Sequence, residues 1–120
     1  MPFRYEEEMY PYVWRNLRNK YPTAAGWEIR NQDIWEGIRI DFVCERRSRG
    51  RIERVVCDAK CRERVNMDDI NQINDYCRCL AGGNAIIREK ILAIPSHSRI
   101  SVNIKNTIKR NNIQLMILRG

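Results

Sequence analysis

The chain has 120 residues, of which 43% are hydrophobic and 31% charged, a balance that fits a globular protein and excludes an intrinsically disordered one. At this length we expect a single domain over residues 1–120, with one core that needs no disulfide or metal to stabilise it. No apolar run approaches the roughly 20 residues of a membrane-spanning helix, and the first residues lack a signal-peptide pattern. We therefore expect an intracellular, cytoplasmic protein with no membrane contact.

Arginine dominates the positive charge of the chain. The net charge is +7, with 17 Arg and 5 Lys. Arginine presents a planar fork of donors that matches the geometry of phosphate, whereas lysine is a point charge. A small, basic, arginine-rich protein therefore indicates nucleic acid as the partner. The alternative is that the arginine content reflects the base composition of the genome and has no role in binding.

The cysteines favour reduced thiols. There are five, an odd number, which argues against a secreted disulfide framework. Their spacings, such as Cys57-x-x-x-Cys61 and Cys77-x-Cys79, do not match a structural zinc site. A metal-binding or cluster-binding protein built on these cysteines is kept as an alternative, but free thiols in a reducing compartment are the favoured interpretation.

The first half of the chain predicts one helix followed by three strands. Residues 4–20 are expected to be helical, with Pro11 causing a kink or a restart of the helix. Strands are expected at 26–30, 38–44 and 52–60, separated by turns that contain glycine. The middle of the third strand is apolar on both faces, which is typical of a central strand.

The second half predicts two helices that alternate with two strands. Asn66 is a good N-cap for a helix that ends at Gly82-Gly83, and 86–94 reads as the next strand. Isoleucines at every fourth position over 100–108 predict a last helix, and 113–118 a final strand. The predicted fold class is α/β, with the order αβββαβαβ and a mixed central sheet flanked by helices.

Charged residues interrupt two of the predicted strands. Asp41 lies in the apolar run Ile38–Val43, and Asp58 and Lys60 follow Val55-Val56-Cys57. Alternation along a strand places Asp58 and Lys60 on the same face, and an acid on a neighbouring strand can face them. Such charges are costly inside a sheet unless they are paired or bind a cation. Two carboxylates beside one ammonium suit a hard divalent cation and a water nucleophile. Asp33 is a rival for the first acid, in a polar and turn-like setting.

This arrangement resembles the PD-(D/E)XK nuclease superfamily. The matched residues are Asp41 and Asp58-Ala59-Lys60, with Glu6 in the first helix and Gln72-Ile73-Asn74-Asp75-Tyr76 in the helix after the motif. The order of elements is similar over residues 4–118. Ile40 stands where the family usually has proline, a position at which the family varies. The resemblance implies a single restriction-endonuclease-like domain.

The resemblance also implies a metal site. Asp41 and Asp58 would be the ligands of Mg²⁺ or Mn²⁺, and the carbonyl of Ala59 would complete the set of protein oxygens. Glu6 would help to bind metal, with Glu7 as the alternative acid on the same helix. The competing interpretation is that Glu6 and Glu7 belong to a solvated acidic first turn.

Two further residues receive catalytic roles from the resemblance. Lys60 would orient or deprotonate the attacking water and stabilise the developing charge. Gln72 would hydrogen-bond the scissile phosphate or Lys60. The alternatives are a strand-end lysine that reaches solvent and a polar residue on the flank of a helix.

Several arginines are candidates for phosphate contacts, which give affinity without reading sequence. Some lie around the predicted turn between the second and third strands, and others directly follow the acid-x-Lys motif. The candidates are Arg46, Arg47, Arg49, Arg51, Arg62 and Arg64. A solvated, charged turn is the alternative for the first group.

The sequence therefore predicts a metal-dependent DNA endonuclease that hydrolyses phosphodiester bonds with Mg²⁺ or Mn²⁺. Its partners would be DNA and a second copy in a homodimer, and it would need no small-molecule cofactor. The main alternative is a catalytically inactive nucleic-acid-binding module of the same fold. The complete set of two acids and one lysine favours the enzyme.

Overall fold

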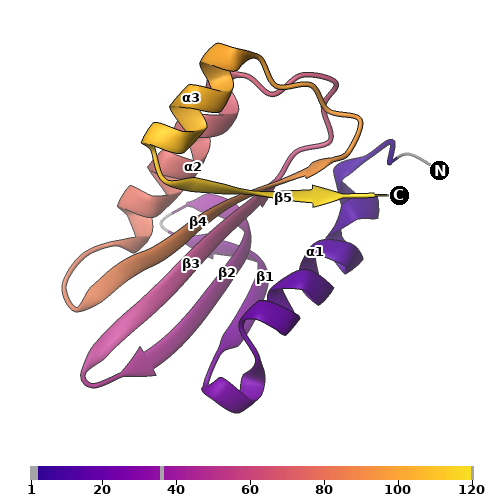
Figure 1. Ribbon diagram of the computed structural model, residues 1–120. Coiled ribbons are helices and arrows are strands. Elements are labelled where there is room, and N and C mark those ends of the chain that lie inside the picture. Colours follow the sequence, from indigo (N-terminus) through magenta and orange to yellow (C-terminus); the bar gives the residue numbers. More distant parts are fainter. Residues whose placement is uncertain (1–2, 36, 120) are drawn as a thin grey trace.

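The chain folds into a mixed sheet flanked by helices, in the element order that the sequence predicts (Figure 1). The computed structural model describes residues 3–35 and 37–119. The elements, in order, are α1 (Glu6–Lys20), a short 3₁₀ helix η1 (Thr23–Ala25), β1 (Glu28–Trp35), β2 (Ile38–Ser48), β3 (Arg51–Ala59), α2 (Met67–Leu80), β4 (Ala85–Pro95), α3 (Val102–Arg110) and β5 (Ile113–Leu118).

The sheet has five strands in the order β1-β2-β3-β4-β5, so each strand lies beside its neighbour in the chain. β1, β2 and β3 pair antiparallel, whereas β4 and β5 are added in parallel after the crossover helices α2 and α3. β3 is the central strand, and Val55 to Ala59 are buried without interruption, as expected for a strand covered on both faces.

Helices cover both faces of the sheet (Figure 1). α1 packs Met9, Val13 and Leu17 against one face, in a cluster with Phe42 and Cys57. α2 and α3 cover the other face, in a second cluster whose members include Ile70, Ile73, Ile108, Val43, Val56 and Leu92. None of the helices in the described ranges is long and apolar enough to cross a membrane.

The helix boundaries follow local sequence. In α2 the N–H of Asp69 donates to Asn66 Oδ1 at 3.2 Å, and Asp69 Oδ2 accepts from the Asn66 N–H at 3.1 Å, so the two residues cap the helix reciprocally. α1 continues through Pro11 as a single helix, so the expectation of a restart there is wrong. Glu8 Oε1 accepts from the backbone N–H groups of Arg4 and Tyr5, which fixes the start of α1 before the proline.

β1 is longer than the predicted strand at 26–30 and begins two residues later in the chain. It begins at Glu28 because Gly26 has a φ of 91° at the end of η1, a conformation that breaks an extended strand. It runs to Trp35 because β2 pairs with it from Ile38 to Glu45, and this pairing overrides the turn-like residues around Gln32. Asp33, the rival first acid, lies opposite Ile40, and its side chain is outside the described part of the structure.

Candidate active site

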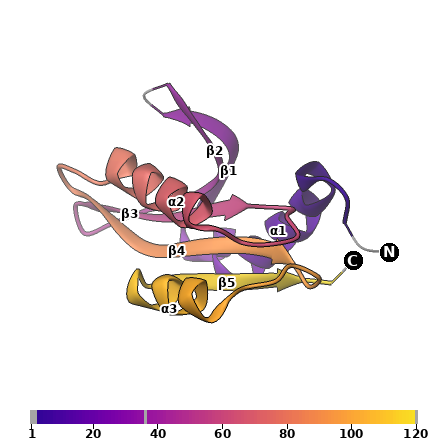
Figure 2. The same cartoon turned by 90° about the horizontal axis from the view of Figure 1, so that it is seen from above.

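The candidate site lies where β2 parts from β3. β2 and β3 pair from Ser48–Arg51 to Phe42–Cys57, and residues 38–40 pair only with β1. One further step of the same register places Asp41 beside Asp58. The hairpin of β1 and β2 bends away from the plane of the other strands (Figure 2). The two acids therefore lie where the sheet opens.

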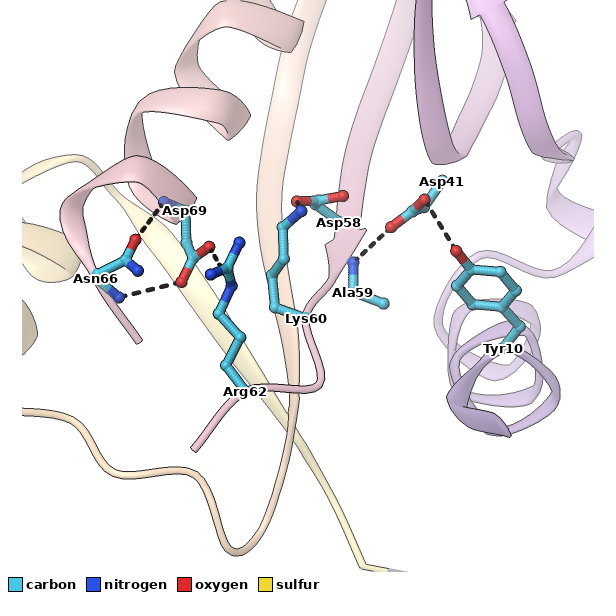
Figure 3. Close-up of polar contacts among 8 residues, drawn as sticks. All are labelled: Tyr10, Asp41, Asp58, Ala59, Lys60, Arg62, Asn66 and Asp69. Atoms are coloured by element: carbon cyan, nitrogen blue, oxygen red, sulfur yellow. Dashed lines mark hydrogen bonds and ion pairs between the residues drawn. The ribbon is translucent and has the colours of Figure 1, made fainter. Parts of the chain in front are cut away.

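Asp41 is held by two neighbouring elements (Figure 3). Its Oδ2 accepts a hydrogen bond from the Ala59 N–H at 2.9 Å, and its Oδ1 accepts one from the Tyr10 hydroxyl at 3.2 Å. The Tyr10 ring also packs edge-on against Phe42, with ring centroids 5.6 Å apart. Asp41 is half-buried, so the alternative of an acid at a strand edge in open solvent does not describe it.

Asp58 is a buried carboxylate whose negative charge is only partly balanced by its neighbours. Its relative exposure is 1%, and its Oδ2 has no hydrogen-bond partner among the described residues. Lys60 Nζ lies 3.4 Å from that oxygen, which is long for a hydrogen bond. Burial, together with the neighbouring Asp41 carboxylate, raises the pKa of Asp58 to about 8 despite the Lys60 ammonium. The positive charge of Lys60 alone therefore does not balance the two carboxylates, and a further positive charge at the site would be stabilising.

Lys60 and Glu6 bring opposite charges to the same place. The Lys60 N–H donates to the Ala93 carbonyl at 2.9 Å, which holds the lysine in line with β3 just beyond the end of that strand. Its side chain is 11% exposed, so the alternative of a lysine that reaches into solvent does not apply. Burial raises the pKa of Glu6, and the Lys60 charge opposes that rise. Glu7 is exposed, and Glu6 is therefore the acid of α1 that faces the site.

α2 forms the wall opposite α1. Gln72 and Tyr76 line an open pocket of about 450 Å³ together with Lys60 and Arg62. Tyr76 is buried, and burial together with the charge of Asp58 raises the pKa of its phenol to about 12. Gln72 thus lines the same pocket as Lys60, and its expected hydrogen bond to a phosphate or to Lys60 stays a prediction.

Arg62 forms an ion pair with a residue at the start of α2 (Figure 3). Its Nε lies 3.0 Å from Asp69 Oδ1, and Asp69 is fully buried as part of the helix cap. The Arg62 side chain remains 45% exposed, so it presents part of its guanidinium to solvent at the edge of the pocket. Arg64 is exposed, and its backbone forms an isolated parallel β-bridge with that of Arg99.

The arginines of the β2–β3 hairpin lie apart from the two acids. Arg51 starts β3, and about seven residues at 3.3 Å per residue separate it from Asp58 by roughly 23 Å. Arg46 is engaged in the fold, with its NH2 nitrogen 2.6 Å from Glu53 Oε2 and its guanidinium 4.6 Å from the centre of the Trp27 ring. The remaining hairpin arginines, Arg47, Arg49 and Arg51, are exposed.

The donors at the site fit a divalent cation. In the described ranges no three His, Cys, Asp or Glu side chains lie together as a metal-binding group. Two carboxylates with a main-chain carbonyl nevertheless suit Mg²⁺, which keeps several of its waters. The unpartnered Oδ2 of Asp58 and the raised pKa of this acid are what a carboxylate meant to meet a cation would show.

Two tyrosines and one acid at the site are not indicated by the sequence pattern alone. The Tyr10 hydroxyl reaches Asp41, and the position of Tyr10 one turn after Glu6 is the signal in the sequence that places both on one side of the helix. Tyr76, the last residue of the Gln-x-x-x-Tyr pattern, lines the pocket. Asp69 pairs with Arg62 because of the loop between β3 and α2, which local patterns do not specify.

The described part of the chain has a restriction-endonuclease-like fold, as its similarity to solved structures shows. The resemblance seen in the sequence is confirmed at the level of fold. A repair endonuclease from Pyrococcus abyssi matches with a TM-score of 0.64 and 20% identity over 98% of this chain and 48% of that one. SfsA from Pyrococcus furiosus, in complex with Ca²⁺, matches with a TM-score of 0.52 and 9% identity over 94% of this chain and 57% of that one.

These likenesses establish the fold alone. The chain spans about half the length of the repair endonuclease and of SfsA. No family model and no curated protein matches the sequence.

Proposed function

We propose that the protein is a divalent-metal-dependent DNA endonuclease that hydrolyses phosphodiester bonds, acting as a single catalytic domain. One observation carries the proposal: Asp58, buried and with an unpartnered Oδ2, lies beside Asp41 and Lys60 where two strands part. A protein has little reason to bury such an acid unless a ligand supplies the missing charge.

Asp41, Asp58 and the Ala59 carbonyl would hold Mg²⁺ or Mn²⁺, and Glu6 would add charge from α1. When bound, the cation polarises the phosphate and lowers the pKa of a water molecule. Tyr10 and the Ala59 N–H fix the Asp41 carboxylate, so that its orientation is set before the substrate arrives.

Lys60 supplies the fixed positive charge of the site. Its ammonium lies next to Asp58 and borders the open pocket, where it can hold the attacking water and stabilise the charge that develops on phosphorus oxygens. Gln72 lines the same pocket and can donate to a phosphate oxygen. Arg62 adds a partly exposed guanidinium at the edge. These donors suit a polyanionic strand, and a homodimer would supply two such sites for cutting both strands.

The test is cleavage of plasmid, branched and single-stranded DNA in Mg²⁺ and Mn²⁺, with DNA binding measured in Ca²⁺. Asp58→Asn should lose metal binding and cleavage but retain DNA affinity, because one negative charge near the phosphates is removed. Lys60→Ala should retain metal and lose cleavage by about 10²-fold or more. Glu28→Gln, a change of an exposed acid at the start of β1, is the matched control and should cut like the wild type.

Metal binding has a readout that does not need cleavage. Mn²⁺ at 100 times its Kd should stabilise the wild type by about 2.7 kcal/mol, and Asp58→Asn should show little of this gain. DNA binding without cleavage under every divalent ion would instead support the inactive binding module. Equal cleavage by the wild type and both site variants would place the chemistry elsewhere.

A further inference from the structure

α1 presents an aromatic ring paired with an arginine near the candidate site. Trp14 is 40% exposed, and the Arg18 guanidinium lies 4.9 Å from the centre of its ring. Arg18 also donates to the Thr23 hydroxyl, which fixes the guanidinium in place. The guanidinium lies over the indole, and Trp14 still keeps this exposed fraction of its surface. A flat apolar surface with a fixed positive charge beside it is therefore open to solvent.

This pair belongs to a row of side chains along α1 that begins at the site. The row, called the ridge below, consists of residues at intervals of four: Glu6, Tyr10, Trp14 and Arg18. Tyr10 contacts Asp41, so the ridge starts at the carboxylates. Trp14 lies one turn further on, about 6 Å along the helix axis. A strand whose phosphate lay at Asp41 and Asp58 and that ran along α1 would reach the indole about one helical turn beyond Tyr10.

We propose that Trp14 and Arg18 form a binding site for single-stranded nucleic acid, where an unpaired base next to the cleaved region stacks on the indole and a phosphate meets the guanidinium. Every base has a face that can stack on an aromatic ring, so this contact does not depend on sequence. In a duplex the bases are stacked inside and do not offer a face. This inference rests on the proposed function and narrows its substrate to single strands or splayed ends.

The charges around the ridge favour this ligand over an apolar partner. Arg15 and Arg18 both lie near the exposed face of α1, and the chain carries a net charge of +7. Besides Glu6 at the start of the ridge, Glu7 is an acid of α1 that opposes a phosphate backbone on this flank, two turns before Trp14. Its removal should strengthen the same interaction.

α1 also offers a matched control. Tyr12 is 43% exposed, and the Arg15 guanidinium lies 5.8 Å from the centre of its ring, so it forms the same kind of pair. Tyr12 contacts Phe3 and lies on the other flank of the helix, away from the Tyr10–Asp41 contact. A general preference of nucleic acid for exposed aromatic residues would involve both pairs, whereas the proposed site involves one.

The experiment measures fluorescence anisotropy of a labelled oligothymidine and of a labelled blunt hairpin duplex in Ca²⁺, where cleavage does not interfere. Trp14→Ala should weaken oligothymidine binding by about 5- to 150-fold, the loss of one stacked base, whereas Trp14→Phe should stay close to the wild type. Arg18→Ala should lower the slope of log K on log salt by about 0.7 for the single strand. Glu7→Gln should bind more tightly. Tyr12→Ala should bind like the wild type, and none of these changes should alter duplex affinity.

The proposal is overturned if Tyr12→Ala loses as much affinity as Trp14→Ala, if Trp14→Ala binds the oligothymidine normally, or if duplex affinity falls by the same factor. Circular dichroism checks that each variant keeps its helices. Failure of the proposed function is distinguishable, because it would appear as absence of cleavage by the wild type in Mg²⁺ and Mn²⁺ whatever the binding results.

Discussion

The Tyr10 hydroxyl donates to Asp41 Oδ1 at 3.2 Å and so joins α1 to the strand that carries the first acid. The other oxygen of Asp41 accepts from the Ala59 N–H, so both oxygens have a protein partner. Asp58, by contrast, has a buried oxygen with no hydrogen-bond partner among the described residues and only the Lys60 ammonium 3.4 Å away. The two acids therefore differ in their surroundings. Asp41 is held in a fixed orientation, whereas the negative charge of Asp58 is not fully balanced by protein groups.

Tyr10→Phe should weaken Mn²⁺ binding by about tenfold, because it removes the hydrogen bond that orients Asp41 and leaves the ring in place. The free energy of unfolding should fall by only about 1 kcal/mol. Calorimetric titration with Mn²⁺ checks the first value and thermal unfolding the second. Tyr12→Phe, which removes an exposed hydroxyl from the same helix, should change neither. Wild-type Mn²⁺ affinity in Tyr10→Phe would show that the hydroxyl has no positioning role.

Asp58 should make the metal-free protein less stable as the pH rises. Its pKa is about 8 in the folded state against an ordinary value of 3.8 for an aspartate, so the folded state holds a proton that the unfolded state releases. Stability from this group is fully present below pH 4 and declines up to about pH 8. The melting temperature of Asp58→Asn minus that of the wild type should therefore increase across this window and level off above it. Glu28→Gln should show no such trend, and a pH-independent difference for Asp58→Asn would refute the assignment.

The exposed hairpin arginines should contribute to duplex binding without sequence preference. Replacing Arg47, Arg49 and Arg51 together should lower the slope of log K on log salt by about 0.9 for each phosphate contact that is lost. An unchanged slope would show that this turn does not touch DNA. Arg46→Ala should act differently and destabilise the fold, because Arg46 pairs with Glu53 and stacks on Trp27.

The buried thiols should be unreactive in the folded protein. Burial raises the pKa of Cys44 to about 12 and raises that of Cys57 well above its ordinary value. Neither should react with a disulfide reagent until the protein unfolds, because the thiolate is the reactive form. Cys61 and Cys79 are half-buried and should react earlier. Cys61→Ser should reduce that early phase, and rapid modification of Cys44 in the native protein would contradict the packing described here.

The sequence predicted those parts of the fold that local patterns specify. α2 begins after Asn66 because a cap and an apolar stripe coincide there, and β3 is central because its apolar run has no polar face. The convergence of Asp41 on Asp58 followed from strand alternation and a hairpin register, both of which depend on near neighbours in the chain.

The remainder depended on tertiary pairing. β1 extends through polar residues because β2 lies beside it, and no pattern within Asn31-Gln32 indicates this. The distance of the hairpin arginines from the site depends on strand lengths, and β2 extends four residues beyond its predicted end. The contact of Tyr10 with Asp41 needs the position of α1 on the sheet, which is set by the packing of Met9, Val13 and Leu17.

Both acids and the lysine belong to residues 41–60, one hairpin whose turn lies at the opposite end of its strands from the site. Substitutions, insertions or charge changes at that turn can therefore remodel the outer surface without displacing the reactive groups. In evolutionary terms, the surface residues of the turn and the reactive residues at the other end of the hairpin can change independently of one another. The same separation makes the turn a convenient place to insert a label or a foreign loop, with metal affinity as the check that the far end of the hairpin has not moved.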